Sequence, residues 1–531
     1  MRRYIVGSLI LGLSLLGSLP LHATEVLSEQ ELAKKIDQFL AARWKTEKIE
    51  PAPLADDAEY LRRLYLDLIG RIPSREEARA FLNDSIPDKR TRRVWRLLDE
   101  GAHVEHFVHV WRDLLIPETN NIEVPGQLNS FTDWLRQQFS QNVPYDRMIS
   151  ELLTVPFGGE RVRSRRMMRN EPSDPAAPSP RAFYLAKDAK PEELAASTAR
   201  LFLGVSIECA QCHNHPFASW TRQHFWGYAA FFAGLQRDAE NNGVIREVFD
   251  RRDIKIPGSL TSAEARFLDE TQPRWKYNVG ARATLAEWLT AANNPYFARA
   301  TVNRLWTHFF ALGLVEPVDD FRPDNPPSHP ELLDELARQF AAHHFDLRYL
   351  VRSITASRAY QLSSAAPASA SLPPRLFAQM AVKGLSPEQL FDSLAMATGY
   401  RPPPRSRPMN NAASPDARAE FLARFAGGQP RTEMQRSIQQ ALMLMNGQFI
   451  ADATRLKNGA MLASIANDRS LDTAGKVEAL YLATLSRKPT TREAKRFVQY
   501  VEEGGPSKDA KQALADVFWV LLNSAEFSLN H

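Results

Sequence analysis

Residues 328–340 read SHPELLDELARQF, and this stretch shows the pattern that dominates the chain. Its apolar residues recur at intervals of three and four and therefore form one helical face: Leu332, Leu333, Leu336, Ala337 and Phe340. Ser328 and Glu331 have the spacing of a capping box, which predicts a helix start. The same spacing occurs at Ser74 with Glu77, Ser386 with Gln389 and Thr490 with Glu493. We therefore predict a mainly α-helical fold.

Three stretches interrupt the helical pattern: residues 170–180, 236–275 and 400–416. The middle one contains the runs Val244–Phe249 and Ile254–Pro257, which could pair as a small β-hairpin. We interpret it as a linker between two helical domains. The predicted organisation is a helical domain at 24–235, a loop-rich linker at 236–275 and a second helical domain at 276–531.

The composition is that of an ordinary globular protein. Of the 531 residues, 44% are hydrophobic and 24% are charged, which excludes a disordered chain or a membrane bundle. The net charge of +4 comes from 66 basic and 62 acidic residues, so no strong field attracts nucleic acid. We expect no nucleic-acid partner.

The first 23 residues have the pattern of a secretory signal peptide. Arg2 and Arg3 precede an apolar run from Ile5 to Leu19, and Ala23 supplies a small residue at the cleavage position. The run is shorter than a spanning helix of about 20 residues, and Pro20 follows it. We expect cleavage after about Ala23, a periplasmic or secreted protein, and no transmembrane span after cleavage. A retained N-terminal anchor is the alternative.

Two cysteines, Cys209 and Cys212, are the only ones in the sequence, and His213 follows them directly. Cys-x-x-Cys-His is the attachment signature of c-type haem. Two thiols three residues apart on one helical turn can reach the two vinyl groups of one porphyrin, and the next imidazole can ligate its iron. We therefore predict one covalent haem c, with His213 as the proximal ligand.

Two other interpretations of the cysteines stay open. Cys209, Cys212, His213 and His215 could form a compact metal site, because thiolates and imidazoles suit zinc. Four ligands within seven residues would strain a tetrahedral shell, however. The cysteines could otherwise form a redox-active or structural disulfide.

Other residues are candidates for the haem surroundings. The distal iron ligand is not identified by the sequence, and the candidates are His109, His224, Met167 and Met168. His215, Phe217 and Trp220 are candidates for the pocket, His215 as a hydrogen-bonding residue. A helix is predicted from Pro191 to Gly204, leading into the motif.

A second group of histidines lies earlier in the sequence. His103, His106 and His109 recur every three residues, and we interpret them as partly exposed rather than as a metal-binding stripe.

Several stretches resemble a known family. The first half resembles the planctomycete-type secreted cytochrome-like family, domain of unknown function 1549. The stretches are Arg62–Gly70 with Pro73, Asn142–Arg147, Glu151–Thr154, Leu201–Val205 and Cys209–Phe217 with Trp220 and Thr221. The second half resembles domain of unknown function 1553, in the stretches Asn303–Trp306, Gly313–Val315, Asp319–Phe321, Pro327–Leu333 and Leu522–Phe527. Asn214, where the family more often has Asp, is one departure.

The resemblance implies two domains in this order, export, and a haem inferred from the motif. It also implies an exported neighbour of the sulfatase or alkaline-phosphatase superfamily type as a partner. It does not supply an activity.

Our leading hypothesis is an exported cytochrome that transfers electrons to or from a partner protein. The alternatives are a haem-dependent oxidoreductase or component of a polysaccharide-degrading system, and a haem-free binding or scaffold protein with a disulfide or metal clip. Whether the chain is an enzyme stays open.

Overall fold

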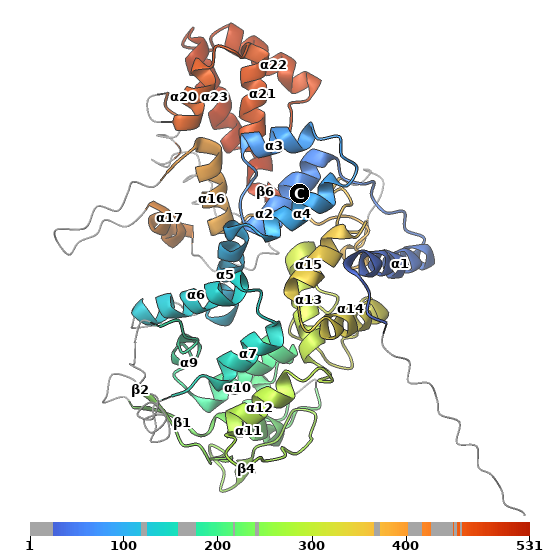
Figure 1. The fold of residues 1–531 in the computed structure, drawn as a ribbon, viewed down its shortest axis with the longest axis vertical. Coiled ribbons are helices and arrows are strands. Elements are labelled where there is room, and N and C mark those ends of the chain that lie inside the picture. Colours follow the sequence, from blue (N-terminus) through green and yellow to red (C-terminus); the bar gives the residue numbers. More distant parts are fainter. Residues whose placement is uncertain are drawn as a thin grey trace, which may run out of the picture.

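The computed structural model describes residues 25–117, 125–157, 177–215, 218–238, 244–365, 372–401, 417–425, 450, 454–456 and 459–531. Over these ranges the fold is mainly helical with small two-stranded sheets, which confirms the predicted fold class (Figure 1). The predicted signal peptide, residues 1–23, lies outside the described residues, and so do Met167, Met168 and Phe217. Among the described helices, none has the length and apolar character needed to cross a membrane.

The first half of the chain contains the following helices: α1 (Glu29–Glu47), α2 (Asp57–Ile69), α3 (Arg75–Leu82), α4 (Lys89–Leu98), α5 (Gly101–Leu115), α6 (Pro125–Ser140), α7 (Tyr145–Thr154), α9 (Ala182–Leu185), α10 (Pro191–Thr198), the π-helix η2 (Ala199–Leu203), the 3₁₀-helix η3 (Glu208–Gln211), α11 (Arg222–Ala229) and the 3₁₀-helix η4 (Ala230–Phe232).

The second half contains α12 (Ala281–Leu289), α13 (Phe297–Phe310), α14 (Pro330–Ala342), α15 (Leu347–Ala356), the 3₁₀-helix η5 (Pro374–Leu376), α16 (Pro387–Thr398), α17 (Ala417–Phe425), α20 (Ala460–Asn467), α21 (Thr473–Thr484), α22 (Thr491–Glu502), α23 (Ala510–Leu522) and the 3₁₀-helix η6 (Glu526–Ser528).

The strands form three antiparallel pairs: β1 (Leu235–Asp238) with β2 (Val244–Glu247), β3 (Asp253–Lys255) with β4 (Ser262–Glu264), and β5 (Lys383–Gly384) with β6 (Leu529–Asn530). The predicted small hairpin within residues 236–275 is confirmed as β3–β4, but Val244–Phe249 and Ile254–Pro257 do not pair with each other. Each run instead pairs with a neighbouring segment, so the predicted linker contributes to two hairpins. The β5–β6 pair brings the C-terminal end back to the middle of the molecule (Figure 1).

Capping residues explain where several helices start. The predicted capping boxes at Ser74, Ser386 and Thr490 are present with both of their hydrogen bonds. The box predicted at Ser328 was wrong: α14 starts after His329, whose side chain makes no capping bond. Pro330 takes the first helical position instead, where its missing N–H has no cost.

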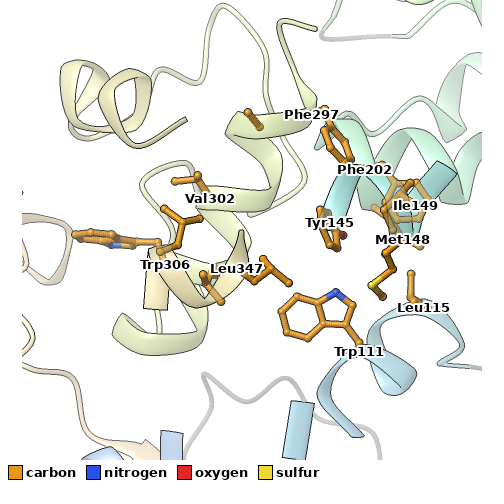
Figure 2. Packing of buried hydrophobic residues seen from close by; sticks show 14 of the residues in the cluster. Trp111, Leu115, Tyr145, Met148, Ile149, Phe202, Phe297, Val302, Trp306 and Leu347 are labelled. Atoms are coloured by element: carbon orange, nitrogen blue, oxygen red, sulfur yellow. The ribbon is translucent and has the colours of Figure 1, made fainter. Parts of the chain in front are cut away.

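Two hydrophobic cores hold the helices together. The larger core is formed by residues between Leu32 and Met380 together with Leu482, and it combines helices from both halves of the chain. Figure 2 shows Trp111 of α5, Tyr145 of α7 and Phe297 of α13 meeting within it; the rings of Tyr145 and Phe297 stack with centroids 5.6 Å apart. The smaller core is formed mainly by residues 390–527, in helices α16, α17 and α20–α23.

Helix α2 lies between the two cores. Its residues Leu64 and Leu68 belong to the larger core, and Leu66 belongs to the smaller one. Every residue from 60 to 69 is buried. A helix that is buried all round must satisfy the polar groups it carries by internal hydrogen bonds. The buried part of α2 carries three charged residues: Arg62, Arg63 and Asp67.

The histidines of α5 differ from the prediction. His103 and His106 are buried against the rest of the larger core instead of being partly exposed, and only His109 is half-buried. His103 Nδ1 donates to the Leu68 carbonyl of α2 at 2.8 Å. The side of α5 that carries His103 and His106 is covered by α2, which a spacing pattern alone does not reveal.

Candidate functional site

Helix α10 leads into the cysteine motif, as predicted from Pro191. The helix continues into the π-helix η2 and ends at Gly204, whose φ of +67° is left-handed. A Cβ at Gly204 would come within 2.5 Å of Phe321 Cδ2. Glycine is therefore required here both by the backbone conformation and by the close approach of Phe321. The chain then turns away from α10 toward the cysteines.

The motif itself lies on a short turn, which we call the cysteine turn (residues 208–215). Cys209 sits in the 3₁₀-helix η3, and Cys212 follows at its end. The two cysteines are three residues apart, which is the spacing at which side chains of a 3₁₀-helix eclipse one another. Both cysteines are exposed, and neither is in a disulfide.

His213 has its imidazole oriented by one hydrogen bond. Its Nδ1 lies 2.8 Å from the Asn214 carbonyl oxygen, which can only accept, so Nδ1 carries the proton. In the neutral imidazole, Nε2 is then the nitrogen with the free lone pair and can act as a ligand. Metal-bound histidines commonly have their other ring nitrogen fixed in this way. His213 is exposed beside the two thiols.

Helix α11 holds the cysteine turn in place. Trp226 Nε1 and Arg222 Nε donate to the Gln211 carbonyl at 3.0 and 3.3 Å. The Arg222 backbone N–H donates to Asn214 Oδ1 at 3.1 Å, and its guanidinium also donates to the Pro257 carbonyl beside the β3–β4 hairpin. Ala210 is fully buried beneath the turn. The turn is thus anchored on its inner side, while its thiols face outward.

The predicted pocket residues lie close to the turn where the structure describes them. The Trp220 carbonyl accepts a hydrogen bond from the His215 backbone N–H at 2.8 Å, and the Trp220 side chain is half-buried against the larger core. His224 is the N3 residue of the α11 capping box: its Nδ1 accepts from the Thr221 backbone N–H at 3.3 Å. Its Nε2 lies 3.6 Å from Glu270. His224 is therefore occupied by structural contacts.

The other described candidate for the distal ligand is far from the turn. His109 lies on α5, and the charged groups around it include Arg112, Asp113, Glu388 and Arg418. Figure 1 places α5 in the middle of the molecule and α11 toward its lower end. The structure does not bring His109 and the cysteine turn together. Burial lowers the pKa of the His109 imidazole.

Glu208, the first residue of the turn, places a carboxyl group next to Cys209. Burial raises the pKa of this carboxyl, and Arg200 lies 3.8 Å away. The hydroxyl of Ser206 donates to the Asp319 carbonyl at 3.0 Å, which ties the segment before the turn to the second half of the chain. In the described residues, no group of three or more His, Cys, Asp or Glu side chains is placed to hold a metal ion.

Comparison with protein families matches two consecutive models to the chain. Residues 35–237 match PSCyt2, "Protein of unknown function (DUF1549)", and residues 281–420 match PSD1, "Protein of unknown function (DUF1553)". The chain belongs to this two-domain DUF1549–DUF1553 family. No curated protein and no solved structure matches it. The sequence resemblance is confirmed, and the cysteine turn falls within the DUF1549 segment.

A second polar site joins the DUF1549 and DUF1553 segments. We call it the Asp67 junction (Asp67, Tyr360, Lys383 and Asn530). Asp67 Oδ1 accepts from Lys383 Nζ at 2.7 Å and from Asn530 Nδ2 at 2.8 Å, and Oδ2 accepts from the Tyr360 hydroxyl at 2.9 Å. Lys383 also donates to the carbonyls of residues 308 and 309. Sequence reasoning missed this site.

Two arginines beside Asp67 extend these connections. Arg62 donates to four carbonyls in the C-terminal part of the chain, at Thr484, Glu526, Phe527 and Leu529. Burial lowers the pKa of Arg62 to about 10, so the side chain stays charged at neutral pH. Arg63 donates to the Tyr360 and Leu362 carbonyls. The available signal in the sequence was the charged residues within the apolar stretch Arg62–Gly70, which indicate buried polar partners.

Proposed function

We propose that this chain is an exported c-type haem protein that transfers electrons to or from a partner protein. The haem would be bound covalently by Cys209 and Cys212, with His213 as its proximal ligand. The observation that supports this best is the cysteine turn. It presents two free thiols and an imidazole with an unprotonated Nε2 on one exposed segment.

The donor set fits the chemistry of a covalent haem. Attachment requires thiols that are accessible and unpaired, and both cysteines meet this requirement. The Asn214 carbonyl fixes the tautomer of His213 with Nε2 available for iron. A haem bound in this way would exchange single electrons. The residues of this chain would hold and orient it.

The exposure of the turn favours electron transfer over catalysis in a closed pocket. Cys209, Cys212 and His213 are all exposed, so a partner protein could approach the haem edge directly. His215 is the last residue of the turn and is bonded through its backbone to the half-buried Trp220; both residues would line one side of the cofactor. The resemblance to the family suggests an exported protein of the sulfatase or alkaline-phosphatase type as the partner to test first.

The test is a pyridine haemochrome spectrum of the mature protein, produced with the c-type maturation system. We expect an alpha band at the c-type position that survives acid–acetone extraction. The control is Cys209→Ala/Cys212→Ala, which should be colourless. A colourless wild-type protein of normal stability would contradict the proposal and would leave thiol titration and metal analysis to identify a disulfide or a clip.

A second pair of variants tests the assignment of the iron ligand. His213→Ala should keep the covalent haem but change its coordination, seen as a shift of the Soret band. His224→Ala is the matched control, because His224 lies near the turn but is occupied by the α11 cap. The same shift in His224→Ala and none in His213→Ala would show that the ligand was assigned wrongly.

A further inference from the structure

The chain directly before the cysteine turn, residues 200–206, is held by the DUF1553 segment. The loop at residues 317–322, which follows α13, forms an antiparallel bridge with it, between Val205 and Asp320. We call this loop together with Arg304 of α13 the clamp. The cysteine turn belongs to the DUF1549 segment and the clamp to the DUF1553 segment, so this contact joins the two.

Two hydrogen bonds fasten the clamp on either side of the bridge. The Phe321 backbone N–H donates to the Gly204 carbonyl at 2.9 Å, and the Ser206 hydroxyl donates to the Asp319 carbonyl at 3.0 Å. The Phe321 ring also lies so close to Gly204 that a Cβ on the glycine would come within 2.5 Å of it. Three successive residues, 204–206, are therefore each held by the clamp.

Arg304 adds an ionic connection to these backbone contacts. Its guanidinium is paired with the Asp319 carboxylate, and its Nη2 also donates to the Arg200 carbonyl of η2 at 3.3 Å. The side chains of Arg304 and Asp319 are only 18% and 23% exposed. Partly buried ion pairs are screened less by solvent and salt than surface pairs are. Arg304 thus ties the loop and η2 to the same point on α13.

The clamp ends close to the first cysteine. Ser206 is separated from the cysteine turn by Ile207 alone, which is 1% exposed, and Cys209 is the second residue of the turn. Helix α11 holds the other end of the turn through Gln211 and Asn214. The turn therefore has one support from each family segment, and the clamp is the one nearer to Cys209.

We propose that the clamp positions the cysteine turn for the haem, with Arg304 and Asp319 as positioning residues. This inference rests on the proposed haem function. Two thioether bonds to one porphyrin require the Cys209 and Cys212 thiols to be held at a fixed spacing, and a turn anchored at both ends keeps that spacing. The DUF1553 segment then contributes to the haem site through residues 200–206 and supplies no ligand.

Hydrogen–deuterium exchange of the haem-free full chain tests the positioning without the cofactor. Arg304→Ala and Asp319→Ala each remove the ion pair, and we expect amide exchange in the peptide covering residues 205–212 to rise roughly tenfold or more. Asp319→Asn keeps an oxygen that accepts from Arg304 and should restore most of the protection. Ser206→Ala removes one hydrogen bond without a change of charge. It should act in the same direction to a smaller extent, and it decides the question if neither charged variant folds.

Glu526→Ala is the matched control. Glu526 is paired with Arg487 at 2.6 Å, and the two side chains are similarly shielded, at 29% and 25% exposed. This pair lies in the C-terminal part of the chain, so its loss should lower the free energy of unfolding but leave exchange at 205–212 unchanged. Circular dichroism establishes which variants fold. Unchanged exchange in the folded clamp variants, or an equal rise in the control, would overturn the proposal.

The midpoint potential of the haem-loaded protein gives a second readout. A loosened turn would admit water beside the haem, which favours the more highly charged oxidised state, so Arg304→Ala and Asp319→Ala should both lower the potential. Shifts of opposite sign would reveal a charge effect in place of positioning, and no shift would reveal a purely structural pair; either result would overturn the proposal. A wild-type protein without a haem spectrum contradicts the proposed function itself, whereas failure of the clamp alone leaves the haem in place with an unchanged potential.

Discussion

The cysteine turn and the Asp67 junction differ in how they are built. The turn consists of consecutive residues, carries its reactive groups outward, and is held by contacts from the neighbouring helix α11. The junction consists of four residues from distant parts of the sequence, which are buried or partly buried and bonded to one another. A local, exposed site can lose its side chains with little effect on folding. A buried junction of distant residues cannot.

The largest effect is expected from breaking the junction. Asp67→Ala leaves the Lys383 ammonium without its carboxylate, and removing one partner of a buried pair costs about 3–5 kcal/mol. The free energy of unfolding in urea measures this loss. Asp113→Ala is the matched control: this carboxylate is also paired with a cationic side chain, but it is 39% exposed, and its loss should cost less than about 1 kcal/mol.

A double variant sharpens this prediction. Asp67→Asn/Lys383→Met removes both charges, so much of the loss seen in Asp67→Asn alone should be recovered. Full additivity of the two single substitutions would show that the pair is not coupled, and would contradict the role given to the junction.

The next effect concerns the glycine that leads into the cysteine turn. Gly204→Ala should destabilise the protein by about 2–4 kcal/mol, because alanine disfavours the left-handed backbone and its Cβ would collide with Phe321. Gly101→Ala provides the comparison, since a Cβ there meets nothing within 4 Å and the residue is helical. It should be neutral or slightly stabilising. Thermal unfolding of both variants checks the difference.

A smaller effect should appear as pH dependence of the buried region. Burial lowers the pKa of His103 to about 4, against 6.5 for the free imidazole. As the pH falls below 6.5, the unfolded chain binds a proton at His103 that the folded protein does not bind. The free energy of unfolding therefore falls by about 1.4 kcal/mol per pH unit. Between pH 6.5 and 5 this amounts to about 2 kcal/mol.

Substitution isolates this contribution. His103→Gln should flatten the dependence of unfolding free energy on pH between 6.5 and 4, measured by urea unfolding at several pH values. His329→Gln should do the same, because burial also lowers the pKa of His329 to about 4. An unchanged slope in both variants would show that these imidazoles are not held neutral by burial.

The smallest effect on stability is expected at the cysteine turn. Cys209→Ala/Cys212→Ala in protein without haem should change the free energy of unfolding by no more than about 0.5 kcal/mol, since both side chains are exposed. Its effect on the proposed haem attachment should be complete. A large loss of stability in the haem-free variant would place the cysteines in the structural framework, and would remove the contrast between the two regions.

Local signals in the sequence accounted for much of the fold. Periodicity predicted the helices, and three of four capping boxes were correct because such boxes depend on residues within one turn. The fourth failed at Ser328, where Pro330 already occupies the first helical position and His329 precedes it. Strand pairing between Val244–Phe249 and Ile254–Pro257 failed because short runs do not specify their partners.

The candidate site was likewise predicted only in part from the sequence. Cys209, Cys212 and His213 were identified from the sequence because the two thiols and the imidazole lie within five residues of one another. The hydrogen bonds that orient them became visible only in the structure: Arg222 and Trp226 donate to the turn, and the Asn214 carbonyl accepts from His213. The position of His109 away from the turn also required the structure, because the path of α5 is set by its packing on α2 and α6.

The sequence by itself determined the helical class, the two-segment family and the reactive motif, because each is written in residues close along the chain. Only the tertiary structure decided how the two segments join. Asp67, Tyr360, Lys383 and Asn530 are separated by up to 463 residues, and they meet because a buried carboxylate needs partners wherever the fold can supply them.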